Sequence, residues 1–120
     1  MTATTTPDLS TGVPRQGREM LGRYSWLARL ADKVRADHAG TNGEYIAYCG
    51  LSMGFLERAG VSKDDFDKLI TEGASDQALV TYFDKHVDDA HRAAANDYVL
   101  NEKSANLAKQ DAEEGYPASN

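Results

Sequence analysis

The sequence predicts an all-α domain, a compact bundle of four to five short helices with room for one short extended segment after the first helix. Apolar residues recur at helical spacing in several separate stretches of the chain. Ser62 and Ser75, which suit helix N-caps, precede two of these stretches, and Gly60 and Gly73, which suit helix ends, follow two. Only residues 44–48 form a β-prone run, and one such run cannot make a sheet.

Composition divides the chain into three regions. Residues 1–14 are Thr-rich and contain Pro7 and Pro14, so we expect a flexible N-terminal arm, with packing of Leu9 and Val13 able to order its end. Residues 15–110 carry the helical periodicity and form the single helical domain, since 120 residues suffice for one modest core. Residues 111–120 are acidic and contain glycine and proline, so we expect a disordered tail.

The first helix is expected to begin at Glu19 or Leu21 and to end at His38. Gly40 stops this helix, and residues 40–43 form a Gly/Asn turn that leads into the extended segment at 44–48. At 100° per residue one broad arc of the helix is apolar. That arc contains Trp26, Leu27, Leu30, Ala31, Val34 and His38.

Four further helical stretches follow. A short helix is expected at 52–59, a second from the Ser62 cap to Glu72, and a third from the Ser75 cap to about Val87. Residues 88–110 contain strong helix formers, and we expect a helix there with a break near Asp88 or Asn101. The predicted core consists of Trp26, Leu30, Phe55, Phe66, Leu69 and Phe83, and His86 is expected on the apolar face of its helix.

The charge distribution limits the classes of partner. The net charge of −6 argues against nucleic acid and against anionic membrane surfaces as partners. Residues 1–60 carry seven Lys/Arg against six Asp/Glu, whereas residues 61–120 carry six against thirteen. Residues 15–35 carry six cationic side chains against two acidic ones. Such a segment suits a small anionic or polar molecule, or an acidic protein patch.

Compartment and membrane signals are also absent from the printed sequence. The single cysteine, Cys49, cannot form an internal disulfide. The first residues lack a cationic and apolar secretory signal, and no apolar run has the length of a membrane span. We therefore expect a cytoplasmic protein.

The basic and aromatic first helix, together with the turn that follows it, is the leading candidate for a binding site. Arginine and lysine donate to carboxylate or phosphate, and aromatic rings stack on flat groups or guanidinium ions. The predicted ligand-binding residues are Trp26, Arg29, Lys33, Glu44 and Tyr45. In the alternative interpretation Trp26 belongs to the core, and the arginines form a solvated face that pairs with the acidic second half of the chain.

Two other functional classes stay open. A small cofactor-free enzyme would use Glu44 or Asp32 as acid or base, and Tyr45 or Tyr48 as a hydroxyl donor. The alternative for Asp32 is ion pairing on the helix surface, and for Glu44 it is stabilisation of the loop. An interaction protein would instead form a homodimer through the Ala/Tyr face of residues 90–107.

The remaining chemical groups form no recognisable motif. His86 and His91 are five residues apart and so point to divergent helix faces, and His38 is remote, so we expect no metal site. No cofactor-binding fingerprint is present, and we expect no cofactor. A lone cysteine such as Cys49, beside an aromatic residue, is more often a small buried hydrophobe than a nucleophile.

Several segments resemble one known family. They are Gly22–Lys33 (GRYSWLARLADK) with Arg35, Ala39–Thr41, Gly43–Tyr45, Cys49 with Leu51, Phe55–Val61 with Phe66, and Gly73–Asp76 with Phe83. Over roughly residues 7–100 this pattern resembles the DUF5069 family of small bacterial proteins, and the WLAR, DK and GEY segments are its most specific part. Arg23 stands where a second glycine is common in the family.

The resemblance implies a compact helical domain and no established activity. It draws attention to the polar residues within the family motif, which are Arg29, Asp32, Lys33, Glu44 and Tyr45 in this sequence.

Overall fold

The computed structural model describes residues 6–116 and contains six α-helices and one π-helical segment in that range. They are α1 (Leu27–Ala39), α2 (Gly50–Ala59), α3 (Lys63–Thr71), α4 (Asp76–His86), α5 (Asp89–Asp97), η1 (Tyr98–Glu102, the π-helix) and α6 (Ser104–Glu113). The all-α class is confirmed. The count exceeds the expected four to five because the helix expected at 88–110 is interrupted by η1, at the expected break near Asn101, and forms two α-helices.

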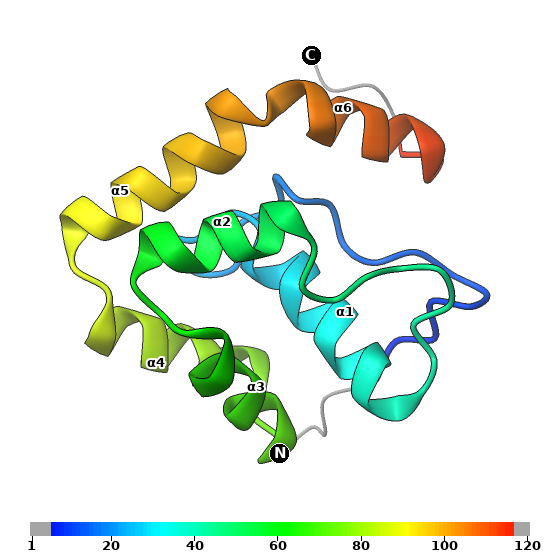
Figure 1. Ribbon diagram of the computed structural model, residues 1–120, viewed down its shortest axis with the longest axis horizontal. Helices are drawn as coiled ribbons and strands as arrows, with labels where there is room; N and C mark the ends of the chain where they lie inside the picture. The colour runs from blue at the N-terminus through cyan, green and yellow to red at the C-terminus, as the bar shows by residue number, and fades with distance from the viewer. Residues whose placement is uncertain (1–5, 117–120) are drawn as a thin grey trace.

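Figure 1 shows α1 in the middle of the molecule, with α3 and α4 on one side and α2, α5 and α6 on the other. Helix α2 packs along α5 and η1, and α1 packs against α3. Within residues 6–116, no helix is both long enough and apolar enough to cross a membrane.

Helix α1 begins at Leu27, so the predicted start at Glu19 or Leu21 was wrong. Leu21 and Tyr24 exchange backbone hydrogen bonds of 3.0 and 3.2 Å across a tight turn, which uses the groups that a helix would need. Gly22 in this turn has φ 61°, and Trp26, directly before the helix, has φ 69°. Two residues in the left-handed region cannot continue an α-helix.

Side-chain caps define the starts of three helices. Ser62 Oγ accepts from Asp65 N at 3.0 Å, and Ser75 Oγ accepts from Ala78 N at 3.1 Å. Both caps were predicted. Asp88 Oδ1 accepts from the backbone N of residue 91 at 2.8 Å and begins α5, which accounts for the predicted break there.

The expected extended segment at 44–48 forms no strand, and Glu44, Ala47 and Tyr48 lie in turns instead. Tyr45 N donates to Asn42 O at 3.0 Å, and Asn42 Nδ2 donates to Tyr45 O at 2.9 Å. These local hydrogen bonds satisfy the backbone, and the described chain offers no strand with which the run could pair.

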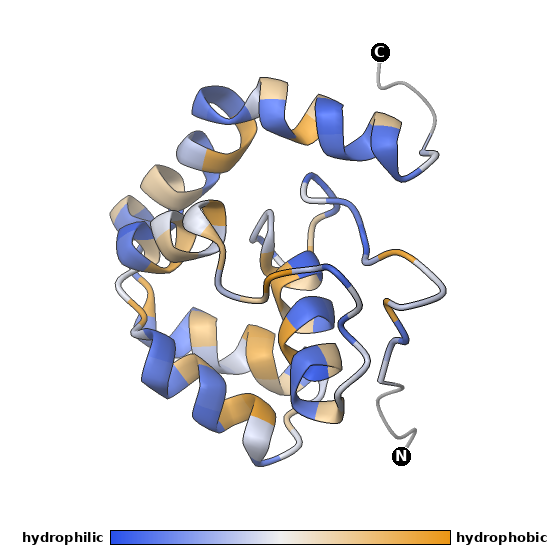
Figure 2. Ribbon diagram, turned by 45° about the vertical axis from the view of Figure 1, so that its right-hand side comes forward, coloured by the Kyte–Doolittle hydropathy of each residue, from blue (hydrophilic) through white to orange (hydrophobic). Residues whose placement is uncertain are grey.

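The core is centred on Phe83, whose ring lies 5.2 Å from that of Tyr24 and 6.2 Å from those of Phe55 and Phe66, centroid to centroid. Figure 2 shows hydrophobic positions alternating with hydrophilic ones along the helices, as the sequence periodicity indicated. Of the predicted core residues, only Leu69 is partly exposed.

His86 was expected on an apolar face, and this prediction was wrong. The residue is exposed because it lies at the last turn of α4, beyond the buried Leu79 and Phe83, and its ring is tilted by 37° against that of Tyr82, with 4.2 Å between the centroids.

Both described ends of the chain contact the rest of the fold. Leu9, in the expected N-terminal arm, is buried, and residues 1–5 lie outside the described range. In the expected tail, α6 continues to Glu113, and Tyr116 Oη donates to Pro14 O at 2.8 Å. Residues 117–120 lie outside the described range. The described end of the chain is therefore folded against the segment that precedes α1.

Candidate functional site

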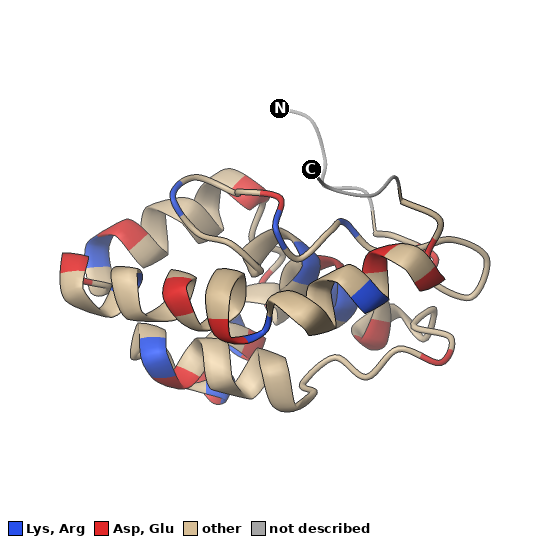
Figure 3. Ribbon diagram, turned by 90° about the horizontal axis from the view of Figure 1, so that it is seen from above, with Lys and Arg blue, Asp and Glu red and all other residues tan. Residues whose placement is uncertain are grey.

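All five arginines of the basic segment, residues 15–35, pair with carboxylates from the second half of the chain. In agreement, Lys/Arg and Asp/Glu positions are interspersed over the ribbon and do not separate into one basic and one acidic face (Figure 3). The pairs are Arg15–Asp76, Arg18–Asp111, Arg23–Asp84, Arg29–Glu114 and Arg35–Asp76. The uneven charge of the sequence is thus largely balanced within the fold.

Asp32, a candidate acid or base, is occupied by Arg15. Asp32 Oδ2 accepts from the backbone N and from Nε of Arg15 at 2.9 and 3.0 Å, and Oδ1 accepts from Nη2 at 3.0 Å. Asp32 is 8% exposed. This carboxylate fixes the segment before α1 to the helix.

Arg29 forms a buried two-point ion pair with Glu114, which follows α6. Nη1 donates to Oε1 at 2.8 Å and Nη2 to Oε2 at 2.6 Å, and the two side chains are 3% and 7% exposed. Tyr45 Oη also donates to Glu114 Oε2, at 3.1 Å. Burial and the neighbouring carboxylate raise the pKa of Tyr45 to about 12, so its hydroxyl stays protonated as a donor.

Trp26 lies between this ion pair and α2. Its fully buried ring has the Arg29 guanidinium 5.5 Å from its centroid, and its Nε1 donates to Ser52 Oγ at 3.0 Å. A bulky residue at φ 69° is strained, and such strain costs about 1–3 kcal/mol. Strain of this kind is concentrated at functional sites, and here it occurs at the residue whose indole contacts Arg29 and Ser52.

Lys33 lies one helical turn after Arg29 on the same face of α1 and is 4% exposed. Its Nζ lies 5.5 Å from the centroid of the Trp26 ring and 3.4 Å from Cys49 Sγ. Among residues 6–116, no carboxylate forms an ion pair with Lys33. Burial lowers the pKa of this ammonium group because it removes hydration from the charged form.

Cys49 is the N-cap residue of α2 and is partly exposed. Its Sγ lies 3.5 Å from Ser52 Oγ in addition to its contact with Lys33. Burial by itself raises the pKa of the thiol, but the Lys33 ammonium and the hydrogen bonds with Ser52 outweigh it, so the pKa lies below its ordinary value. Lys33 and Ser52 therefore favour the thiolate form of Cys49.

The structure brings together four of the five predicted ligand-binding residues, Trp26, Arg29, Lys33 and Tyr45. Glu44 is exposed in the turn and makes no hydrogen bond or ion pair within the described chain. Tyr48, the other expected hydroxyl donor, donates instead to Asp67 Oδ1 at 2.9 Å. We call the residues around Lys33 the Lys33 cluster. It consists of Trp26, Arg29, Lys33, Tyr45, Cys49, Ser52 and Glu114.

Sequence reasoning missed Ser52 and Glu114 and gave Cys49 little weight. Glu114 lies in a segment whose composition suggests disorder, and nothing in the sequence relates it to Arg29. The position of Cys49 directly before a helix was a usable signal, since thiols at helix N-termini are readily deprotonated.

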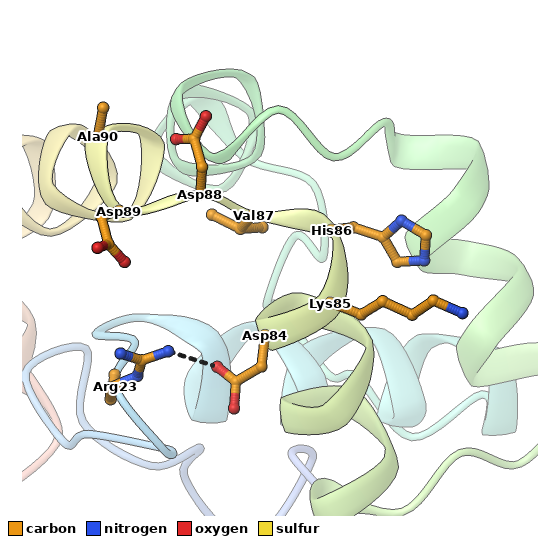
Figure 4. Close-up of a pocket in the computed structure, with 8 residues that line it drawn as sticks. All are labelled: Arg23, Asp84, Lys85, His86, Val87, Asp88, Asp89 and Ala90. Carbon is orange, nitrogen blue, oxygen red and sulfur yellow. Dashed lines mark hydrogen bonds and ion pairs between the residues drawn. The ribbon is translucent and has the colours of Figure 1, made fainter.

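A separate cavity of about 590 Å³ lies on the surface between α4 and α5 (Figure 4). Its lining residues are Arg23 and the run Asp84–Ala90. Arg23 and Asp84 face each other across 3.4 Å, and their side chains are 59% and 42% exposed. The cavity contains none of the predicted site residues, and its charges are mixed and well hydrated.

A family model described as a domain of unknown function, DUF5069, matches residues 11–118. The chain belongs to the DUF5069 family. The resemblance seen in the sequence is thereby confirmed, and the match continues past residue 100 through Glu114, so all seven residues of the Lys33 cluster lie within the DUF5069 domain. No curated protein matches the chain. Within the part of the chain that the structure describes, no three His, Cys, Asp or Glu side chains are grouped as metal ligands would be.

Proposed function

We propose that this DUF5069 protein is a binding module for a small anionic ligand, which it holds at the Lys33 ammonium beside Trp26 and Cys49. The observation that carries this proposal is the near-complete burial of Lys33, 4% exposed, without a carboxylate partner among the described residues. Buried charges in proteins are normally paired, because an unpaired one costs several kcal/mol.

The charges of the Lys33 cluster support this choice. Arg29 and Lys33 supply two buried cations, whereas Glu114 supplies one carboxylate, and both of its oxygens are bound by Arg29. While Cys49 is a neutral thiol, the cluster therefore keeps one uncompensated positive charge. A bound anion would balance it.

Unused donors support the same ligand chemistry. An ammonium group has three N–H donors, and Lys33 uses one of them, toward Cys49. Arg29 Nε is buried and has no partner within the described chain. The Trp26 ring adds a flat apolar surface. Tyr45 contacts Arg29 with its ring and Glu114 with its hydroxyl group. A compact anion, such as a carboxylate or phosphate group, fits this set of donors better than a long polyanion.

The single tryptophan provides a direct test, because Trp26 is part of the cluster. The protein is titrated with inorganic phosphate, acetate and succinate at constant ionic strength while tryptophan fluorescence is followed. We expect a saturable change with at least one of these anions. Lys33→Met, which keeps the apolar stem and removes the charge, abolishes the change, whereas Lys68→Met on the exposed face of α3 leaves it intact. No saturable change in the wild type, or an equal one in Lys33→Met, overturns the proposal.

The other functional classes have less support. As an acid or base, Asp32 would first have to leave Arg15, and Glu44 is in the solvent-exposed turn. For a homodimer through residues 90–107, Tyr98 and Leu107 are already buried in the core, which leaves Leu100, 37% exposed, as the large apolar side chain that this face offers. An acidic protein patch would compete with the internal partners of the arginines.

A further inference from the structure

We propose that Cys49 is a nucleophilic site that forms a mixed disulfide with a small anionic disulfide. The choice of an anionic substrate rests on the function proposed above, whereas the assignment of Cys49 as the nucleophile rests on its own geometry.

Three groups converge on the sulfur from different parts of the chain. Lys33 Nζ on α1 lies 3.4 Å away, and Ser52 Oγ in the first turn of α2 lies 3.5 Å away. Cys49 itself occupies the N-cap of the ten-residue helix α2, whose free backbone N–H groups carry partial positive charge. Each of these features favours a thiolate over a thiol.

The two groups that contact the sulfur are more deeply buried than Cys49 itself. Lys33 is 4% exposed and Ser52 is fully buried, whereas Cys49 is partly exposed. Removal of water strengthens the attraction between an ammonium and a thiolate. The Cys49 residue is therefore partly open to solvent, while the ammonium group beside its sulfur is shielded.

The other charged groups near Lys33 and Cys49 do not cancel the attraction between the ammonium and the thiolate. On α1 the neighbour is Arg29, which adds positive charge, and its Nε is buried without a partner in the described chain. Beyond α6 the neighbour is Glu114, which is held by Arg29 and by the hydroxyl of Tyr45. Lys33 is buried, is directed at the sulfur and has no carboxylate partner among the described residues, and this arrangement points to a ligand at the thiol and not to a merely packed cysteine.

The chemical step is an exchange that needs no separate oxidant. The Cys49 thiolate attacks one sulfur of a disulfide R–S–S–R, the new Cys49–S–S–R bond forms, and the original S–S bond breaks. Its electron pair leaves with R–S⁻, which takes a proton from solvent. Cys49 then no longer balances Lys33, and a carboxylate or phosphate on R restores the lost negative charge. The chain has no second cysteine, so the product persists until an external thiol reverses it.

The nucleophile is tested on the full-length reduced protein with iodoacetamide, a neutral reagent, by mass spectrometry. Because there is one cysteine, a single alkylation is measured. We expect the rate to reach half its maximum below the ordinary thiol pKa of about 8.5. At pH 7, Lys33→Met should be slower by about 10-fold, and Lys68→Met should match the wild type. A half-maximum at or above the ordinary value in the wild type overturns the nucleophile, whether or not Lys33→Met folds.

The substrate class is tested by mixed-disulfide formation with three reagents of similar length. They are dithiodipropionate (anionic), hydroxyethyl disulfide (neutral) and cystamine (cationic). We expect the anionic reagent to give the highest yield at equilibrium, and Lys33→Met to lose this preference. Equal yields, or a preference for cystamine, overturn the anionic class. Rapid alkylation with no response in the fluorescence titration would rule out the proposed anion site and keep Cys49 as a nucleophile. A saturable fluorescence response with slow alkylation would keep the anion site and rule out the nucleophile.

Discussion

Replacing Glu114 with Gln should destabilise the fold far more than its place near the chain end suggests. The change leaves Arg29 charged and 3% exposed, with only a neutral amide and the carbonyl oxygen of Arg15 as acceptors. Breaking a buried ion pair costs about 3–5 kcal/mol, and we take about 3 kcal/mol because the Gln oxygen can still accept one hydrogen bond. At an unfolding entropy of about 2.1 cal/mol/K per residue, 120 residues give roughly 0.25 kcal/mol/K, so the Tm falls by about 12 °C.

The measurement is urea unfolding followed by the fluorescence of Trp26, with calorimetry for the Tm. Glu113→Gln is the matched control, because Glu113 is the adjacent residue with the same chemistry and is exposed. It should change the free energy of unfolding by less than about 0.5 kcal/mol. Removing both charges, in Arg29→Met with Glu114→Gln, should recover part of the loss. If Glu114→Gln and Glu113→Gln behave alike, the ion pair does not hold the chain end as described.

Two further predictions concern packing and pH. Gly54→Ala should lower the free energy of unfolding by about 1–3 kcal/mol, because the added methyl group would overlap the ring of Tyr98. In the control Gly50→Ala, in the same helix, the methyl group meets no atom within 4 Å, so the free energy of unfolding should stay the same or rise by up to about 1 kcal/mol. Equal urea midpoints for the two variants would contradict this prediction. Burial opposes ionisation of Asp76, but hydrogen bonds from Arg15 and Arg35 outweigh it and hold the pKa of Asp76 below its ordinary value of 3.8. Its stabilising contribution is therefore present above pH 3.8 and is lost as the pH falls through the lower, folded-state value. Asp76→Asn should lower the free energy of unfolding at pH 7 and make its decline below pH 4 less steep, and an unchanged slope in acid would count against the network.

Local signals in the sequence were sufficient for much of the helical framework. Ser62 and Ser75 cap their helices as predicted, since a serine hydroxyl needs only the backbone N–H three residues later. The helical spacing identified Phe66 and Phe83 as core residues because it also depends only on nearby positions in the chain. The start of α1 was misplaced because the apolar periodicity passes through Leu21 and Trp26 even though the backbone there turns.

The candidate site depended on contacts that no local pattern encodes. Arg29 and Lys33 were singled out by composition and by the family motif, but their burial follows from packing against segments far along the chain. Arg29 meets Glu114, 85 positions later, and Lys33 meets Cys49, 16 positions later. A carboxylate in an acidic, Gly-containing stretch cannot be told from a solvated one until the fold places it.

The sequence by itself therefore determined the all-α class, the helix caps, the apolar core and the family, because each depends on spacing along the chain. Only the tertiary structure decided that the arginines are largely neutralised internally, that Glu114 closes over Arg29, and that Lys33 is left with a thiol as its partner. The physical reason is that the cost of burying a charge depends on which groups surround it in space.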